Sequence, residues 1–458
     1  MSKAKEKIQT IPFLRNYRYL FFITSLLFAL IFCFINITAD DEFRLTSEVN
    51  TSFAAIIHNG VMEYQTWTSR FLVNLVMRVV TVLTPLFPVM MFFSSYLFQY
   101  SLSELFDRVH TKESTLFIAC ISYCLPWSEL CSAGWIATLT TYYLPAAFGL
   151  FALIPIKKCL DGRRITWKGA IAYSLALIYS ANNEQIMAIL LACYFIFFIY
   201  FIVKRKLHII IFTQFILTIA SAVFILTCPG NSVRSSSELR WFPTFESLRL
   251  ANKIELGFST TAHHLLFAGI LIVMFMEVLL AITVCSKYKE KIFRYIACIP
   301  CVISVINVLF PQIFTNLIPF DSALRSDIPK YGLLNPDSYA SRGNFVDFMI
   351  LGVFLLLTFL SFLLASHYFS DLLLVFCLLG GGLAARAAVA FSPTIYASEC
   401  RTFAPLYIII IAATTLIFER NLEHRVYSVT ALKWIHIVSA AALLMSFLIL
   451  GMNVTFIG

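Results

Sequence analysis

Three consecutive acidic residues, Asp40, Asp41 and Glu42, directly follow an apolar stretch that ends near residue 38. One interpretation is structural, because acids at a helix end cap its backbone amides. The other is chemical. A carboxylate that is partly withdrawn from water and lies near a like charge has a raised proton affinity, which suits a base that deprotonates a hydroxyl. Asp40 and Asp41 are the candidates for such a base, and the sequence does not choose between them.

The chain that positions these acids is too apolar for a water-soluble protein. Of its 458 residues, 60% are hydrophobic and 13% are charged, and its mean hydropathy is +0.83. Soluble domains carry about 25% charged residues. Apolar stretches of about 20 residues, long enough to cross about 30 Å of hydrocarbon, recur between the charges. We predict an all-α polytopic membrane protein and no nucleic-acid partner, despite the net charge of +9.

We expect about thirteen transmembrane helices in a single integral-membrane domain, residues 1–458, without a separate soluble domain. Long outer loops are expected at 39–70, 228–263 and 312–346. The approximate spans are 19–38, 71–97, 114–126, 138–156, 168–181, 185–203, 208–227, 264–285, 295–311, 347–366, 372–390, 404–418 and 434–451.

The distribution of charge predicts the orientation of the chain. With the N-terminus in the cytoplasm, most of the 34 Lys and Arg residues fall in inner segments, as membrane proteins generally require. Most of the 25 carboxylates fall in the outer loops instead. An odd number of spans then places the C-terminus outside. Because the long loops are also external, we expect the functional surface on the outer face.

The first outer loop continues with apolar residues at helical spacing: Val49, Phe53, Ile56 and Ile57. This pattern predicts an amphipathic helix around 47–59, lying in the membrane interface. Tyr64, Trp67 and Arg70 then lead into the second span, where aromatic residues are also typical of an interfacial belt.

The cysteine and histidine residues do not predict a cofactor. Most of the 12 cysteines lie in apolar stretches, which argues against a disulfide scaffold. His263 and His264 open a predicted span, where a polar role at the helix end suits them better than metal binding, since no H-x-x-x-H or paired acid–His spacing supports a tight site. We therefore predict no required metal or cofactor, with a divalent cation at the Asp40/Asp41 pair as an alternative.

The acidic pair followed by Tyr64-x-x-Trp67-x-x-Arg70 resembles the first-loop pattern of bacterial GT-C-fold glycosyltransferases that use polyprenyl-phosphate sugars. The similarity is closest to the O-antigen-modifying glucosyltransferase type. These relatives usually carry glycine before the arginine, where this chain has Ser69. Later motifs are similar too: Asn182-Asn183-Glu184 in a tight outer turn, Pro229-Gly230-Asn231-x-x-Arg234, and Ser392-Pro393-x-x-Tyr396 with Arg401.

The resemblance implies an inverting transfer of a hexose, such as glucose, from undecaprenyl phosphate or a similar polyprenyl-phosphate carrier. The acceptor would be a hydroxyl of a cell-surface or lipid-linked glycan, such as the O-antigen of lipopolysaccharide, at the periplasmic face of the bacterial inner membrane. One carboxylate deprotonates the acceptor, and cations neutralise the leaving phosphate. We assign the donor phosphate to Arg234, Arg401 and Lys330, and substrate binding to Arg44, Tyr64, Trp67, Arg70, Asn183, Glu184 and Asn231.

Two other classes stay open as alternatives. A membrane polysaccharide polymerase or ligase would share lipid-linked substrates but would depend more on outer-loop Arg or His than on an Asp pair. A flippase or transporter of a lipid-linked saccharide would use charges near the bilayer midplane and often shows two related halves. Arg78, Glu277 and Arg386 could serve a transporter, but the chain has no evident internal repeat.

Overall fold

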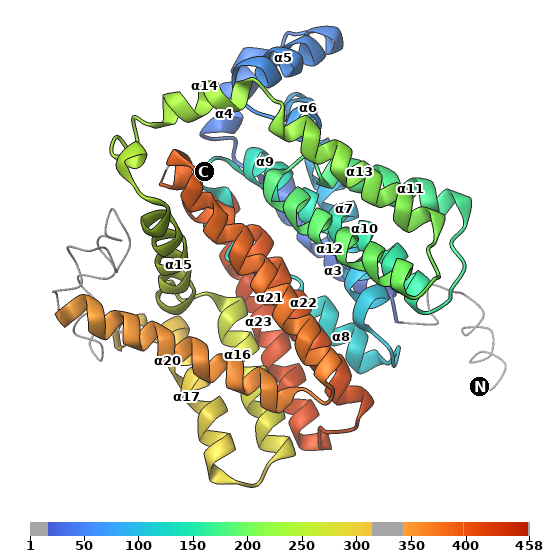
Figure 1. Ribbon diagram of the computed structural model, residues 1–458, viewed down its shortest axis with the longest axis vertical. Helices are drawn as coiled ribbons and strands as arrows, with labels where there is room; N and C mark the ends of the chain where they lie inside the picture. The colour runs from blue at the N-terminus through green and yellow to red at the C-terminus, as the bar shows by residue number, and fades with distance from the viewer. Residues whose placement is uncertain (1–16, 314–341, 397, 457–458) are drawn as a thin grey trace.

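The computed structural model describes residues 17–313, 342–396 and 398–456, and every regular element in these residues is helical (Figure 1). Seven helical stretches in this part of the chain are long and apolar enough to cross a membrane, as expected for a membrane-embedded protein. Four of them are single helices: α12 (Glu184–Val203), α13 (Ile209–Leu226), α17 (Lys291–Leu309) and α23 (Val429–Phe456). The other three each join consecutive helices. Trp135–Leu160 contains α9 (Trp135–Thr138), η3 (Leu139–Tyr143) and α10 (Leu144–Leu160); Phe369–Phe391 contains α21 (Phe369–Ala387) and η5 (Ala388–Phe391); and Cys400–Glu423 contains most of η7 (Glu399–Phe403) and α22 (Ala404–Glu423).

An eighth span exists if α15 (Leu250–Phe267) and α16 (Leu271–Lys287), which meet at 73°, cross as one broken helix. Thirteen crossings are therefore not confirmed, although each expected span overlaps a helix. The remaining elements are α3 (Tyr19–Ile31), η1 (Phe32–Phe34), α4 (Asp40–Glu48), α5 (Phe53–Thr66), α6 (Phe71–Val82), α7 (Leu86–Phe106), α8 (Lys112–Ile121), η2 (Glu129–Cys131), α11 (Trp167–Ser180), α14 (Gly230–Glu238), η4 (Phe245–Ser247), α20 (Arg342–Ala365) and η6 (Pro393–Ile395).

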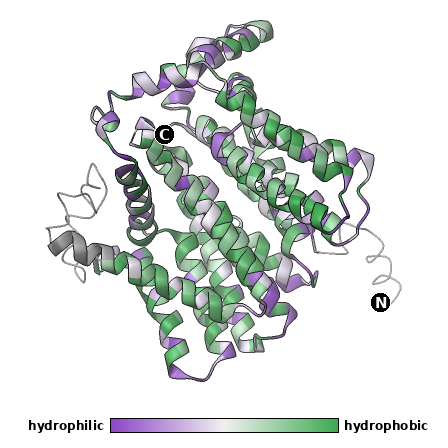
Figure 2. Cartoon of the chain, viewed as in Figure 1, coloured by the Kyte–Doolittle hydropathy of each residue, from purple (hydrophilic) through white to green (hydrophobic). Residues whose placement is uncertain are grey.

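The burial of the helices follows a membrane pattern. Every residue from 402 to 419 is buried, and α22, which contains most of them, packs against α7, α8, α16 and α21. By contrast, the buried residues of α17 are only Ala297, Pro300, Ser304 and Asn307, and the helix exposes apolar side chains such as Ile299 and Val302. Such exposure would be unfavourable in water, but lipid chains are as apolar as these residues. Figure 2 shows the same division, with hydrophobic residues along the long helices and hydrophilic ones gathered on α4, α14 and the connecting loops.

The expected span 71–97 is two helices rather than one. α6 ends at Val82 and α7 begins at Leu86, with Pro85 between them. Proline lacks a backbone N–H and disfavours helical geometry in the residue before it, so a continuous helix breaks here. As a result, α6 is a short helix that places its N-terminal end, at Arg70, beside the start of α12.

The first outer loop is also two helices, and the single helix expected around 47–59 is wrong in its bounds. α4 ends at Glu48, and α5 begins at Phe53 after Ser52, whose hydroxyl accepts a hydrogen bond from the Ala55 backbone N–H at 3.3 Å. This N-cap starts a new helix inside the expected one. Of the predicted apolar stripe, Ile56 is buried, whereas Val49 and Phe53 are exposed.

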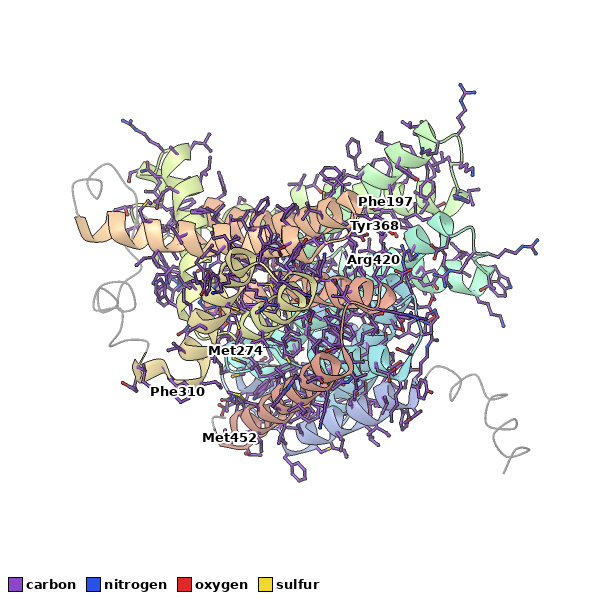
Figure 3. The ribbon with its side chains drawn as sticks, turned by 90° about the horizontal axis from the view of Figure 1, so that it is seen from below. Phe197, Met274, Phe310, Tyr368, Arg420 and Met452 are labelled. Atoms are coloured by element: carbon purple, nitrogen blue, oxygen red, sulfur yellow. The ribbon has the colours of Figure 1, made fainter. Side chains whose placement is uncertain are left out.

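Gly230 lets α14 lie directly on the end of α5, at the top of Figure 1. A Cβ atom at this position would stand 2.4 Å from the backbone nitrogen of Trp67, which no side chain could tolerate. At the opposite end of the bundle, Arg420 of α22, labelled in Figure 3, pairs with Asp371 of α21 at 2.7 Å. The chain thus brings α4, α5 and α14 to one end, where most of the predicted site residues lie.

Candidate active site

A cavity of about 460 Å³ lies at the α4–α5–α14 end of the bundle. Its walls come from α4, the turn between α5 and α6, the stretch Trp135–Leu160, α14 and the segment around η7, which are far apart in sequence. Half of the predicted site residues line it: Asp40, Arg44, Trp67, Arg70, Arg234 and Arg401. We call this space the arginine cavity.

The two adjacent aspartates have different environments. Asp41 is fully buried, and its two carboxylate oxygens accept hydrogen bonds from the backbone N–H groups of Ile136 and Ala137, at 2.8 and 2.7 Å. It therefore caps the start of α9 from a distant part of the chain. Asp40 is exposed and lines the arginine cavity, whereas Asp41 does not.

Gly134 explains how Asp41 reaches the helix so closely. Its φ of +97° lies in the left-handed region, and a Cβ atom there would stand 2.6 Å from Cγ of Asp41. Burial raises the pKa of Asp41 to about 6, against the lowering effect of the two backbone hydrogen bonds. Because both oxygens point at the α9 backbone, the pair does not present two carboxylates to one cation in the cavity.

Arg44 is held at the rim by a group of charges that also includes Arg78. The Glu63 carboxylate lies 3.5 Å from Arg44 and 2.7 Å from Arg78, and Glu48 forms a further ion pair with Arg78. Arg78 was a candidate for a charge used in transport. It has two carboxylate partners, Glu48 and Glu63, and a buried cation needs such partners.

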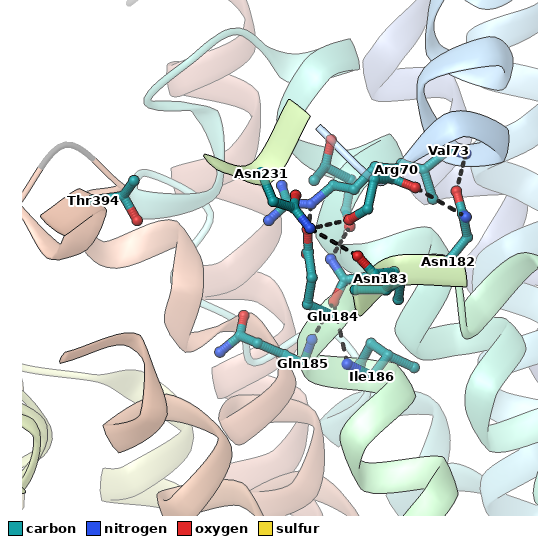
Figure 4. Close-up of polar contacts among 12 residues, drawn as sticks. Arg70, Val73, Asn182, Asn183, Glu184, Gln185, Ile186, Asn231 and Thr394 are labelled. Atoms are coloured by element: carbon teal, nitrogen blue, oxygen red, sulfur yellow. Dashed lines mark hydrogen bonds and ion pairs between the residues drawn. The ribbon is translucent and has the colours of Figure 1, made fainter. Parts of the chain in front are cut away.

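Arg70 forms the opposite wall through a contact with the start of α12 (Figure 4). Its Nε donates to Oε2 of Glu184 at 2.7 Å, and the hydroxyl of Ser69 donates to the other carboxylate oxygen at 3.0 Å. Burial alone would lower the pKa of Arg70, but the Glu184 carboxylate outweighs it and raises that pKa. The serine that departs from the related pattern thus has a defined role here, because it helps to fix Glu184.

The turn before Glu184 is built by two asparagines, both buried (Figure 4). The Asn183 side chain accepts hydrogen bonds from the Gln185 and Ile186 backbone N–H groups and so caps α12. The Asn182 carbonyl oxygen accepts from the Leu72 and Val73 N–H groups, at 2.7 and 3.2 Å, and so caps α6. Asn183, predicted to bind substrate, does not line the cavity; it positions Glu184.

Arg234 of α14 lies between two cavities. It lines the arginine cavity and also a second one of about 310 Å³, whose walls include Glu184 and Asn231. Its Nε is buried without a hydrogen-bond partner among the described residues, and its guanidinium is 6.0 Å from the centre of the Trp67 ring. Burial and the charge of Arg70 lower the pKa of Arg234. An anion bound here would offset both the burial of the Arg234 charge and its repulsion by Arg70.

The second cavity extends between α12 and α21 and is more apolar than the first. Ala188 of α12 and Ala385, Ala388 and Val389 of the Phe369–Phe391 stretch line it. Arg70, Arg234 and Ser398 line both cavities, so the two spaces share one cationic wall.

The remaining predicted residues, Tyr64, Arg401 and Lys330, lie in three different places. Tyr64 packs α5 against α13: its hydroxyl donates to the Phe224 carbonyl at 2.9 Å, and its ring stacks on the Phe224 ring. It therefore does not line either cavity. Arg401, from η7, does line the arginine cavity. Lys330 lies outside the residues that the structure describes.

Several cavity residues gave no signal in the sequence. Tyr142 and Thr138 come from a stretch that reads as an ordinary span, but η3 within it is a π-helix, a distortion that is common at functional sites. Arg240 and Trp241 follow α14 and also line the cavity. Their types could have suggested a site, because arginine and tryptophan are typical binding residues, but nothing marked them among the other loop residues.

Comparisons with known proteins do not extend these observations. The chain matches no protein-family model, no curated protein and no solved structure.

Proposed function

We propose that this protein is an inverting glycosyltransferase with a GT-C-like architecture, which moves a hexose from a polyprenyl phosphate to a hydroxyl of a surface or lipid-linked glycan. The reaction would take place on the outer face of the bacterial inner membrane. The observation that carries the proposal is the arginine cavity: one exposed carboxylate, Asp40, shares it with Arg44, Arg70, Arg234 and Arg401 at an end of a membrane-embedded bundle. This is the arrangement that an acceptor base and a leaving phosphate require.

Asp40 is the better candidate for the base. It lines the cavity, whereas both oxygens of Asp41 already accept backbone hydrogen bonds. In the proposed step, Asp40 takes the proton of the acceptor hydroxyl while that oxygen bonds to the anomeric carbon. The bond from the anomeric carbon to the phosphate oxygen breaks on the opposite side, and its electron pair leaves on the phosphate. The configuration of the sugar is inverted.

The wall shared by the two cavities is the proposed site of the phosphate. Arg70 is partly neutralised by Glu184, whereas Arg234 lies beside it with a buried nitrogen that has no hydrogen-bond partner in the part of the chain that the structure describes. Adding a phosphate here would place negative charge where two guanidinium groups converge, and charge-assisted hydrogen bonds of this kind are strong. The prenyl chain would then lie in the apolar cavity between α12 and α21, and the sugar would lie in the arginine cavity near Asp40.

A transfer assay tests the proposal. The purified protein in lipid nanodiscs is incubated with a radiolabelled polyprenyl-phosphate hexose and an acceptor glycan, and the label in the glycan is measured over time. We expect time-dependent transfer that gives the inverted anomer. Label that crosses the membrane of sealed vesicles without any transfer would support a flippase instead, and joining of whole lipid-linked repeats would support a polymerase.

A further inference from the structure

Three metal-binding side chains from distant segments meet beside the arginine cavity. They are Glu129 of η2, His264 of α15 and Cys400 of η7, and one donor atom from each lies within 4.8 Å of the other two. Nε2 of His264 is 3.0 Å from Oε1 of Glu129, and Nδ1 is 3.9 Å from Sγ of Cys400. The next residue after Cys400 is Arg401, which lines the cavity.

We propose that Glu129, His264 and Cys400 bind one zinc ion or a similar divalent transition metal. Imidazole, thiolate and carboxylate are the ligands that zinc takes in proteins, whereas magnesium and calcium prefer sets made of oxygen alone. Zinc–ligand bonds of about 2.0–2.3 Å place neighbouring ligand atoms about 3.3–3.7 Å apart. The Glu129 oxygen is already about this close to Nε2 of His264, whereas the Cys400 sulfur, which lies nearer Nδ1, would have to move closer to the other two donor atoms by up to about 1 Å.

The ligands are already oriented by their neighbours. The Tyr407 hydroxyl donates to Oε2 of Glu129 at 2.6 Å, which leaves Oε1 directed at the His264 ring. The Phe403 ring, 4.1 Å from the centre of the His264 ring, limits the rotation of the imidazole. Hydrogen bonds and packing of this kind around the ligands are a regular feature of protein metal sites, because they fix the geometry before the ion arrives.

The side chain of Arg386 lies close to the three proposed ligands. The Arg386 guanidinium lies 4.2 Å from the centre of the Phe403 ring and interacts electrostatically with Cys400 and Tyr407. Its Nε and Nη1 are buried without hydrogen-bond partners among the described residues.

The ion would join η2, α15 and η7 and so hold the segment that carries Arg401. This role is structural and does not depend on the proposed sugar transfer. It also differs from the cation site considered at Asp40 and Asp41, because it lies on other residues and contains sulfur.

The test uses Co²⁺ as the probe. The full chain, with its affinity tag removed, is purified in detergent, treated with a chelator and titrated with Co²⁺ alone. We expect one ion per chain and a thiolate-to-cobalt charge-transfer band in the near ultraviolet. Cys400→Ser should remove the band, and His264→Gln and Glu129→Gln should weaken binding more than Tyr407→Phe, for which we expect a loss of about 10–100-fold. Cys33→Ser, at an exposed cysteine in η1, is the matched control and should change nothing.

X-ray absorption of the zinc-loaded wild-type protein gives a second result that needs no variant. We expect one sulfur and two or more nitrogen or oxygen ligands, together with a melting temperature above that of the metal-free protein. A chain that binds no stoichiometric Co²⁺ or Zn²⁺ would overturn the proposal and leave a hydrogen-bonded group of side chains. A sulfur-free zinc shell, or a band that persists in Cys400→Ser, would overturn it equally.

Discussion

The two ends of the helical stretch Trp135–Leu160 carry cavities of different charge. At the Trp135 end, the arginine cavity is lined by Arg44, Arg70, Arg234, Arg240 and Arg401 but by only three acids: Asp40, Glu63 and Glu238. At the Leu160 end, a cavity of about 320 Å³ is lined by Arg108, Lys157 and Arg163, together with His110, and by the acids Glu104, Asp107 and Asp161.

The two ends differ in how far their charged side chains are balanced by ion pairs within the protein. At the Leu160 end, Arg163 contacts both Glu104 and Asp161, and Lys157 contacts Asp161 at 2.6 Å. These short contacts balance the charges within the protein. At the Trp135 end, the lining has more cations than acids, and Nε of Arg234 is buried with no hydrogen-bond partner among residues 17–313, 342–396 and 398–456. Balanced pairs join segments, whereas an excess of cations around one cavity indicates a place for an anion.

The strongest test of this difference is Asp40→Asn. Asparagine keeps the shape of the side chain but cannot accept the acceptor's proton, and a positioned general base contributes about 10²–10⁴-fold. We expect initial transfer rates to fall by about that factor, with unchanged expression and melting temperature. Glu42→Gln, on the same helix but outside the cavity, is the control and should keep the wild-type rate. An Asp40→Asn variant with the wild-type rate would remove Asp40 from the mechanism.

The second test compares arginines at the two ends. Arg234→Ala should lower kcat/KM for the lipid donor by about 10²-fold, because the leaving phosphate loses a stabilising cation. Arg401→Ala should act in the same direction. Arg163→Ala, at the Leu160 end, should leave kcat/KM unchanged. Equal losses in all three variants would mean that the excess of cations at the Trp135 end has no special role in transfer.

The third test separates Asp41 from Asp40. Asp41→Asn should lower the free energy of unfolding by about 1–2 kcal/mol, because the asparagine NH2 group cannot accept the second of the two backbone hydrogen bonds that Asp41 accepts. The effect depends on pH. Because the folded state raises the pKa of Asp41 from 3.8 to about 6, it binds the proton more tightly than the unfolded state. This contribution is complete below pH 3.8 and is lost as the pH rises through 6.

Melting temperatures measured from pH 4 to 7 check this sign. The wild-type protein should lose stability relative to Asp41→Asn as the pH rises across that range. A stability difference that stays constant with pH would show that Asp41 does not carry the raised pKa. Transfer by the folded variant at close to the wild-type rate would confirm that Asp41 supports the site without acting as the base.

The smallest expected effect is at the Leu160 end. The pair between Arg163 and Glu104 is partly exposed, and such pairs contribute about 0.2–1 kcal/mol. A double-mutant cycle of Arg163→Ala and Glu104→Gln, followed by thermal melting, should give a coupling energy in that range. A much larger coupling would mean that this end is also a tightly organised site, and the comparison of the two ends would fail.

The sequence was most informative about composition and periodicity. Apolar stretches such as 185–203 and 208–227 predicted α12 and α13 closely, because a helix in lipid must be both long and apolar. It also identified Asp40, Arg70 and Arg234 as residues worth testing, since charged residues are rare in such a chain. The breaks between helices were harder to predict. The division at Pro85 and the start of a new helix at Phe53 depend on local caps and turns inside segments whose sequence looks continuous.

What the sequence by itself determined is that this chain is a bundle of membrane helices with its unusual charges at particular positions. Only the tertiary structure decided what neighbouring residues do. Asp40 and Asp41 are chemically identical and adjacent, yet one faces a cavity and the other caps α9, about a hundred residues further along the chain. Glu129, His264 and Cys400 share no local pattern and meet only in the folded chain. The physical reason is that burial, hydrogen bonding and the nearness of other charges come from segments distant in sequence, and these determine whether a polar side chain supports the fold or binds a ligand.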